Sequence, residues 1–505
     1  MMEEKGEEEI KRICREVIER IRPDEEERRK VKAVAETIIA KLNKKASEMG
    51  MEVYAISVGS TARNTWISGE ADIDVFIMFP EGVSEEELKE NGLALAKSIS
   101  DRYEERYASH PYIHAYFRDA EGRTEYEVDL VPCFSVKAAS LLKSAVDRTP
   151  FHNEYIVKRI SGLEEEVLLL KQFLKCRGIY GSEQRRKGFS GYLCELLSIR
   201  YSSFVELLRH ASKWKYGERI DIEGRGTYKG AGKDPLIVID PVDPNRNVAA
   251  AVSLDSFCRL IDAARDFLVC SDTSFFLLAK EKEMSKAEFV KLVKERGTEL
   301  VMVLFEAPDV VEDVLFPQLR KAEASVKSMI ERNGFTVYRS DVSVGGDKAF
   351  LVFELLVWCL PEIKRHEGPP VTLKHHSELF KSKYEPFSFG KRKAFTEKKN
   401  NSEVLLQRAV RIEHGRYVVE VERKYTDVVD LLKHELKSCG SGKQVSESIN
   451  KGYEVLKNEE IMFFEGLGSF FSEFFGFGIS RKLKIALPAK SSKRKKKTRV
   501  NPYLK

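Results

Sequence analysis

Residues 58–80 read VGSTARNTWISGEADIDVFIMFP. The stretch ends in an apolar run typical of a buried strand, and Asp72 and Asp74 stand at the start of that run. Because side chains alternate along a strand, both carboxylates point to one face, opposite Ile73 and Val75. Two carboxylates held side by side repel each other unless a positive charge lies between them, and a divalent cation such as Mg2+ suits that position. For the pair taken alone, the alternative is a solvated strand end.

A glycine–serine pair, Gly59 and Ser60, precedes these acids. A small turn of this kind at the start of a helix presents backbone N–H groups and a hydroxyl, which are the groups that cradle phosphates. Arg63 follows three residues later, about one helical turn on, and is placed to face the same anion. A phosphate cradle followed by metal-binding carboxylates predicts a nucleotide site on one strand–turn–helix–strand unit.

A third acid lies in the next strand pattern, residues 125–132, which read EYEVDLVP. Alternation places Asp129 on the same face as Glu125 and Glu127, but apolar residues flank Asp129 more closely. Pairing of the two acid-bearing strands would bring Asp129 beside the first two aspartates and complete a metal site. An edge-strand charge that only aids solubility is the alternative for Asp129 taken alone.

These motifs together resemble a known family. The pattern G-S-x11-D-x-D followed by a strand aspartate resembles the nucleotidyltransferase superfamily of DNA polymerase β. The sequence of residues 58–80 also closely resembles the archaeal, class I CCA-adding enzyme, the tRNA nucleotidyltransferase that builds the 3′-terminal CCA. Four further motifs carry the same resemblance: EYEVDLVPCF, RTPFHNEYI, LLLKQFLKCRGIYGSE and DPVDPNRNVAAAVS. The similarity runs in order through residues 25–470.

The resemblance implies a reaction in which an RNA 3′-hydroxyl attacks the α-phosphorus of CTP or ATP and releases pyrophosphate by a two-metal mechanism. The predicted catalytic residues and ligands of Mg2+ are Asp72, Asp74 and Asp129. It also implies binding of the tRNA acceptor and T arm, and a homodimer. Two alternatives stay open: a poly(A) polymerase-like enzyme with the same palm, and a non-catalytic RNA-binding scaffold.

The predicted nucleotide-binding residues combine the phosphate cradle with positions carried over from the family: Gly59, Ser60, Arg63, Thr149, His152, Lys171, Tyr180 and Arg246. Because C and A are chosen without a nucleic-acid template, protein groups must read the base edge. The resemblance assigns this task to Arg246, whose directed donors suit O2 and N3 of C or N1 of A. The alternatives are a surface lysine at Lys171, a structural histidine at His152 and a structural arginine after Pro244.

Composition limits the class of protein. The chain of 505 residues has room for three or four domains, and its hydrophobic content of 42% is ordinary for a soluble globular protein. Residues 488–505 hold eight Lys and Arg and no acids, so residues 1–487 carry 77 basic against 80 acidic side chains. Any RNA surface on the folded part must therefore be a face and not a global excess, and the tail is expected to be a disordered basic segment.

Targeting and cysteine chemistry give negative signals. The eight cysteines are scattered without a C-x-x-C pair, so neither a disulfide framework nor a zinc site is expected. The start of the chain is a charged helix and does not resemble a signal peptide. The longest apolar run, residues 349–360, is interrupted by Glu354 and is too short to span a bilayer. We expect a cytoplasmic protein with no membrane association.

The expected fold class is α/β and α+β multidomain, with a polymerase β-like palm on a mixed sheet, a helical central domain and α+β C-terminal RNA-binding domains. The expected domains are N-terminal helices packing on the palm (1–50), the palm (51–152), a helical domain with the base-recognition loop (153–290), a β-α-β-β module (291–370), a tRNA-binding tail domain (371–487) and the basic tail (488–505). Periodicity predicts helices over 10–21, 24–50, 85–106, 163–176, 193–214 and 253–270.

Three further segments carry weaker signals. Residues 224–232 are glycine-rich without Walker or Rossmann spacing and are interpreted as a loop, with phosphate binding as the alternative. Residues 374–399 mix lysines and aromatics, which suits RNA or an inward-packed irregular segment. The Phe-rich residues 466–478 are predicted to dock against another domain.

Overall fold

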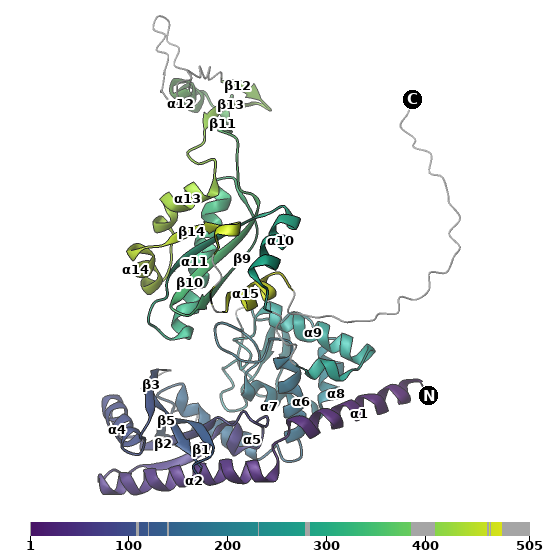
Figure 1. Ribbon diagram of the computed structural model, residues 1–505, viewed down its shortest axis with the longest axis vertical. Helices are drawn as coiled ribbons and strands as arrows, with labels where there is room; N and C mark the ends of the chain where they lie inside the picture. Colours follow the sequence, from purple (N-terminus) through teal and green to yellow (C-terminus); the bar gives the residue numbers. More distant parts are fainter. Residues whose placement is uncertain are drawn as a thin grey trace, which may run out of the picture.

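The computed structural model describes residues 2–107, 111–119, 121–138, 141–230, 232–277, 283–384, 410–461, 464 and 466–476. The basic tail 488–505, residues 385–399 of the lysine- and aromatic-rich stretch, and residues 477 and 478 of the Phe-rich segment lie outside these ranges. Figure 1 shows a mixed palm sheet and a helical domain at one end, a second sheet with helices in the middle, and a small sheet at the far end. The predicted multidomain α/β and α+β class is confirmed.

The two N-terminal helices are α1 (Met2–Ile21) and α2 (Glu25–Glu48), as predicted. The side chain of Asp24 caps α2 by accepting the backbone N–H of Glu27 at 2.7 Å. The carboxylate of Glu27 accepts hydrogen bonds from the Ser68 hydroxyl and the Gly69 N–H. Only α2 packs on the palm, whereas the apolar face of α1 joins the core of the helical domain.

The palm elements are β1 (Tyr54–Val58), α3 (Gly59–Ala62), β2 (Ile73–Pro80), α4 (Glu85–Ser98), β3 (Tyr103–Tyr107), β4 (Pro111–Arg118) and β5 (Glu125–Ser135). The strand order is β1-β2-β5-β4-β3, with β2 and β5 parallel and the other pairs antiparallel. The predicted helix over 85–106 is too long. Hydroxyls of Ser98 and Ser100 bind the last carbonyls of α4, and residues 103–107 pair with β4 as a strand.

One face of the palm sheet is buried under α2 and α4. Ile73, Val75 and Ile77 project into this core, where they meet apolar residues of both helices. The alternation predicted for this stretch is therefore confirmed, and it directs the acids at 72 and 74 to the opposite face. That second face carries only a small apolar cluster, which leaves room for a site.

The helical domain contains α5 (Thr149–Val157), α6 (Glu164–Lys175), α7 (Gly191–Tyr201), α8 (Phe204–Ala211), α9 (Leu254–Val269), the short strands β6 (Glu218–Ile220) and β7 (Leu236–Val238), and the 3-10 turns η2 (Val146–Arg148) and η3 (Thr273–Phe276). The helix predicted over 193–214 is broken in two. Ser202 adopts a left-handed φ of 58°, and Ser203 caps α8 by accepting the N–H of Glu206. The described residues of 224–232 form a loop, as predicted.

The middle sheet has the order β14-β8-β10-β9 and is antiparallel. Its elements are α10 (Lys286–Arg296), β8 (Glu299–Glu306), α11 (Glu312–Arg332), β9 (Thr336–Gly345), β10 (Lys348–Val357), α13 (Val428–Glu435), η4 (Leu436–Ser438), α14 (Lys443–Lys451), β14 (Glu454–Lys457), η5 (Asn458–Glu460) and α15 (Leu467–Phe474). This confirms the predicted β-α-β-β order and adds β14 from much later in the chain.

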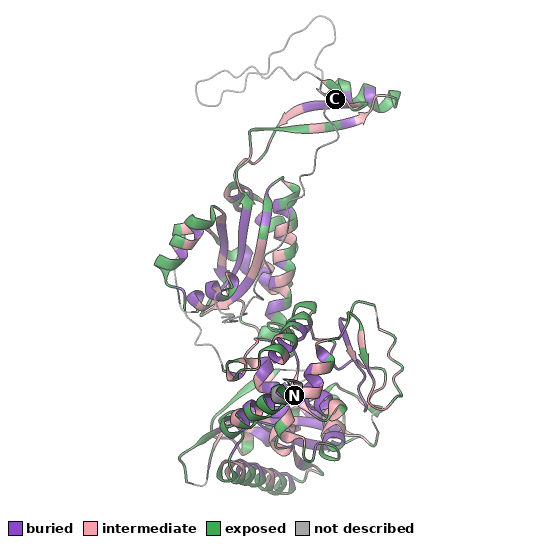
Figure 2. Cartoon of the chain, turned by 90° about the vertical axis from the view of Figure 1, so that its right-hand side faces the viewer, coloured by how far each residue is buried: buried purple, intermediate pink, exposed green. Residues whose placement is uncertain are grey.

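Alternating residues of β8 and β10 supply two cores. One face packs against α11, α13 and α14, and the other packs against α10 and α15. The Phe-rich helix α15 docks there through Phe471, whose ring lies 4.4 Å from that of Phe289. Figure 2 shows these strands mostly buried, with exposed residues along the outer sides of the helices.

The small distal sheet has the order β11-β13-β12 and is built from β11 (Ile363–Pro370), β12 (Arg411–Glu413) and β13 (Arg416–Glu422), with α12 (Lys374–Tyr384) against it. Phe380 of α12 packs on Tyr417 of β13, so part of the aromatic content of residues 374–399 faces inward. None of the helices in the described ranges is both long and apolar enough to cross a lipid bilayer.

Candidate functional site

Asp74 and Asp129 stand directly opposite each other on the parallel strands β2 and β5. Both project from the palm face that α2 and α4 leave open, since their neighbours in sequence fill the covered face. Asp72 lies just before β2 and is exposed to solvent. The structure thus brings the three predicted carboxylates to one edge of one sheet face.

Gly59 lies against the Asp74 carboxylate at this edge of the sheet. It has a left-handed φ of +78°, and a Cβ placed on it would lie 1.9 Å from Oδ2 of Asp74. Any other residue would displace the carboxylate or the turn. The turn that begins α3 therefore passes in direct contact with Asp74, which joins the predicted phosphate cradle to the predicted metal ligands.

The electrostatics of the acids favour a bound cation. Burial, helped by the charges of Asp129 and Asp72, raises the pKa of Asp74 to about 7. Asp72 is more exposed, but partial desolvation of its carboxylate and the charges of Glu127 and Asp129 also raise its pKa. Within the described residues, no Lys or Arg forms an ion pair with any of the three aspartates. Their negative charge is therefore left for an ion or substrate to neutralise.

His114 is a member of this site that sequence reasoning missed. Its Nδ1 lies 2.6 Å from Oδ1 of Asp129, and its Nε2 lies 3.4 Å from Oε2 of Glu127. The side chain is buried, and β4 pairs it with Asp129 across the sheet. The available signal was a histidine inside the apolar strand pattern PYIHAYF. The contact holds Asp129 in one orientation.

The donor set fits a divalent ion that is completed by substrate. Among the described residues, no group of three or more His, Cys, Asp and Glu side chains is arranged so that it could hold a metal ion by itself. Open coordination is what Mg2+ requires when it keeps waters and binds substrate phosphates, whereas a structural zinc site would be closed. The carboxylates and the glycine turn suit the first kind of site.

Arg63 does not lie free beside the turn. Its Nε donates to Glu195 at 2.8 Å and its Nη1 donates to Asn153 at 2.9 Å, and both charged side chains are buried. Glu195 also accepts the hydroxyl of Thr65 at 2.6 Å. Arg63 thus ties the palm to α5 and α7, and no described residue engages its Nη2.

Lys171 is buried on α6, which excludes the alternative of a surface lysine. Its Nζ donates to the carbonyl of Thr65 at 2.6 Å. Gly191, at the start of α7, leaves space beside Nζ and the Tyr180 hydroxyl, since a Cβ there would lie 3.6 Å and 3.3 Å from them. Burial lowers the pKa of Lys171 and raises that of Tyr180. The two predicted nucleotide-binding residues therefore lie together.

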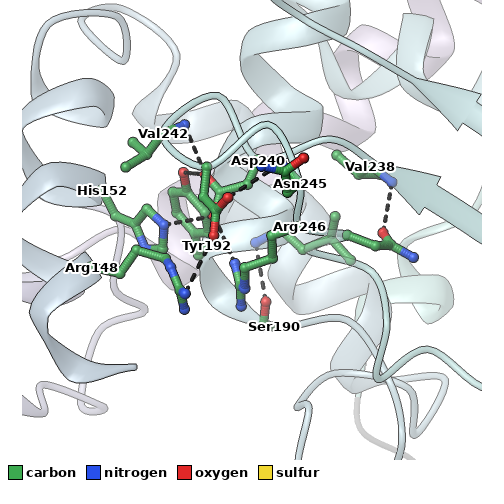
Figure 3. A network of polar contacts seen from close by, with 12 residues as sticks. Arg148, His152, Ser190, Tyr192, Val238, Asp240, Val242, Asn245 and Arg246 are labelled. Atoms are coloured by element: carbon green, nitrogen blue, oxygen red, sulfur yellow. Dashed lines mark hydrogen bonds and ion pairs between the residues drawn. The ribbon is translucent and has the colours of Figure 1, made fainter. Parts of the chain in front are cut away.

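Two of the remaining predicted residues, His152 and Arg246, converge on an acid that sequence reasoning did not assign a role. His152 Nε2 and Arg246 Nη1 lie 2.9 Å and 2.8 Å from Oδ2 of Asp240, and Tyr192 donates to Oδ1 at 3.2 Å (Figure 3). The rings of His152 and Tyr192 are stacked, with centroids 4.0 Å apart. Thr149 begins α5 one turn before His152. An arginine and two rings gathered on one buried carboxylate suit recognition of a flat base.

Asp240 had a usable signal in the sequence, and Tyr192 had none. Asp240 ends the apolar run LIVID, which is the same pattern of an acid at the edge of a strand that marked Asp74. Burial alone would raise the pKa of Asp240, but hydrogen bonds from His152, the Val242 N–H and Arg246 lower it to about 2. Asp240 is therefore a charged anchor at neutral pH.

Three family models match consecutive parts of the chain. The nucleotidyltransferase domain model matches residues 39–152, the model for the second domain of tRNA nucleotidyltransferases matches 165–277, and the model for the C-terminal domain of CCA-adding enzymes matches 296–458. The match regions follow the palm, the helical domain and the middle and distal sheets described above.

Curated relatives match across most of the chain. The CCA-adding enzyme of Methanosarcina barkeri is 44% identical over 451 residues, covering 88% of this chain and 93% of the relative. That of Archaeoglobus fulgidus is 37% identical over 457 residues, covering 90% and 96%. Among solved structures, the Cid1 poly(U) polymerase with magnesium and 3′-dATP aligns with 54% of this chain and 99% of its own, at a TM-score of 0.43 and 17% identity.

Proposed function

The chain belongs to the archaeal CCA-adding enzymes, tRNA nucleotidyltransferases that add CCA to tRNA 3′ ends, and we propose that its palm aspartates and the Asp240 cluster divide the work of catalysis and base selection. The observation that carries the proposal is the position of Asp74, which stands opposite Asp129 and in contact with the turn at Gly59. Phosphate and metal groups would meet at that point.

In this proposal Asp72, Asp74 and Asp129 hold two Mg2+ ions, and His114 orients Asp129. When bound, such ions lower the pKa of an attacking hydroxyl and neutralise charge on a triphosphate. The chain's own residues do the positioning: the turn at Gly59 and Ser60 binds triphosphate oxygens through its backbone N–H groups, and the buried ammonium of Lys171 supplies a positive charge.

The nucleotides in this proposal are CTP and ATP. Arg246 presents N–H donors that match the acceptors N3 and O2 of cytosine and N1 of adenine. The Nη2 group of Arg63 would bind the triphosphate, because Nε and Nη1 already donate to Glu195 on α7 and Asn153 on α5. We further propose that the enzyme acts in the cytoplasm as a homodimer and grips the acceptor and T arm of tRNA with its C-terminal sheets.

The test is incubation of the pure protein with tRNA that lacks CCA and with each labelled NTP in turn. We expect two C residues and then one A, with dependence on Mg2+. Long A tails would make the protein a poly(A) polymerase, and no incorporation from any NTP would leave an RNA-binding scaffold. Light scattering of the purified protein measures whether it is a dimer.

A further inference from the structure

Asp240 is completely buried, and all of its acceptor positions are occupied. Its Oδ1 accepts from the Val242 N–H at 3.0 Å and from the Tyr192 hydroxyl at 3.2 Å, and its Oδ2 accepts from His152 and Arg246. A carboxylate has about four acceptor positions. Asp240 therefore has none left for a substrate, and it cannot rotate without breaking several hydrogen bonds.

Arg246 is held at two points. Its backbone carbonyl accepts the N–H of Asp240 at 3.1 Å, and its Nη1 donates to the same residue's carboxylate. The side chain is 37% exposed, and no other described residue forms an ion pair with it. One nitrogen of the guanidinium is thus anchored on Asp240 (Figure 3), while the side chain as a whole stays partly exposed to solvent.

The orientation of the guanidinium donors matters for the choice of base. Cytosine offers acceptors at N3 and O2, adenine offers an acceptor at N1, and uracil carries a donor at N3. A guanidinium N–H held in one direction can donate to the acceptors of cytosine and adenine. In the same position it would point at the N3–H donor of uracil. A freely rotating arginine would instead reach O2 or O4 of uracil, because a long side chain has many rotamers.

We propose that Asp240 is a positioning residue for nucleotide selection, whose carboxylate holds the Arg246 guanidinium in the orientation that separates C and A from U. The inference rests on the proposed role of Arg246 as the reader of the base. His152 and Tyr192 act through Asp240, because both donate hydrogen bonds to its carboxylate and so fix its orientation. Their rings also stack on each other beside it.

The test uses Asp240→Asn, which keeps the shape of the side chain but removes its charge and replaces one acceptor oxygen by an NH2 donor that cannot bind Arg246. The readout is kcat/KM for CTP, ATP and UTP on tRNAs that end before the first C and before the A. We expect UTP use relative to CTP to rise by about tenfold or more. Asp240→Asn combined with Arg246→Ala should raise that ratio no further than Arg246→Ala alone.

Asp243→Asn is the matched control. Asp243 lies in the same turn, and its carboxylate pairs with Arg148 at 3.3 Å and not with Arg246. Its loss should leave the UTP to CTP ratio unchanged. Tyr192→Phe is the second variant, because it keeps the ring and removes one donor to Asp240. It should shift the ratio in the same direction as Asp240→Asn by a smaller factor.

The outcomes separate the inference from the proposed function. A changed ratio in Arg246→Ala with an unchanged ratio in Asp240→Asn overturns the positioning role and leaves Arg246 as the reader. Unchanged ratios in both variants overturn the role of Arg246 itself. If Asp240→Asn does not fold, an unchanged ratio in Tyr192→Phe overturns the inference. Additive effects in the double variant overturn it as well.

Discussion

His152 and Asn153 are neighbours on α5, yet they bind opposite parts of the site. His152 contacts Asp240 through Nε2 at 2.9 Å, and Asn153 accepts Nη1 of Arg63 at 2.9 Å. Helix α5 therefore links Arg63, which follows the turn at Gly59, to the cluster that holds Arg246. We therefore expect a substitution at one of these contacts of α5 to disturb the other.

Arg63→Ala should destabilise the fold because it leaves Glu195 buried without its cation. Breaking a buried ion pair by removing one partner costs about 3–5 kcal/mol. Arg63→Ala with Glu195→Gln should recover most of that loss, since the buried charge is gone. Denaturant unfolding of the three proteins measures it, and a double variant no more stable than Arg63→Ala would refute the argument. A raised KM for NTP in the recovered double variant would support contact of Arg63 with the triphosphate.

Gly59→Ala should reduce catalysis by about a hundredfold, because displacing a reacting group by an ångström has effects of that size. The added Cβ would collide with Oδ2 of Asp74. Gly69→Ala is the control, since Gly69 has a similar φ of +79° but nothing within 4 Å of its Cβ. Single-turnover CMP addition and tRNA affinity should be measured for both. Equal losses in the two variants would attribute the effect to backbone strain alone.

The stability of the enzyme should fall on mild acidification partly through His152. Burial lowers the pKa of His152; Asp240 opposes this, and the charges of Arg246 and Arg148 add to it. In the unfolded state His152 binds a proton at a higher pH than in the folded state. The free energy of unfolding therefore declines as the pH drops below about 6.5, by at most about 1.4 kcal/mol per pH unit. His152→Gln should flatten the curve between pH 7 and 5.5. The exposed His376→Gln is the control, and an unchanged slope in His152→Gln would contradict the prediction.

Arg246→Ala should damage nucleotide choice more than triphosphate binding. Losing a directed donor to a base edge costs on the order of 1–3 kcal/mol of discrimination. We expect poorer use of CTP and ATP, relatively more UTP misincorporation and unchanged Mg2+ dependence, measured as kcat/KM on tRNAs ending at each stage. Proportional losses for all three nucleotides would leave Arg246 a structural residue.

The acid pattern of the palm was predictable because alternation and register follow from local sequence. Asp72, Asp74 and Asp129 were found in this way, and the covered face behind them was implied by the same alternation. His114 and Tyr192 were not found, because each acts through a partner distant in sequence, Asp129 and Asp240. The breaks at Ser98 and Ser202 depend on hydroxyl hydrogen bonds and a left-handed residue, which apolar periodicity does not register.

The central claim is that the three palm aspartates hold the metal ions of catalysis. Its most direct test is single-turnover addition of C and A by Asp74→Ala, with tRNA affinity and Mn2+ binding measured on the same protein. We predict loss of Mn2+ binding and of both additions with tRNA affinity kept, because RNA contact relies on other surfaces. Activity above about one hundredth of the parent protein, which is less than about 3 kcal/mol of lost transition-state stabilisation, would contradict the account.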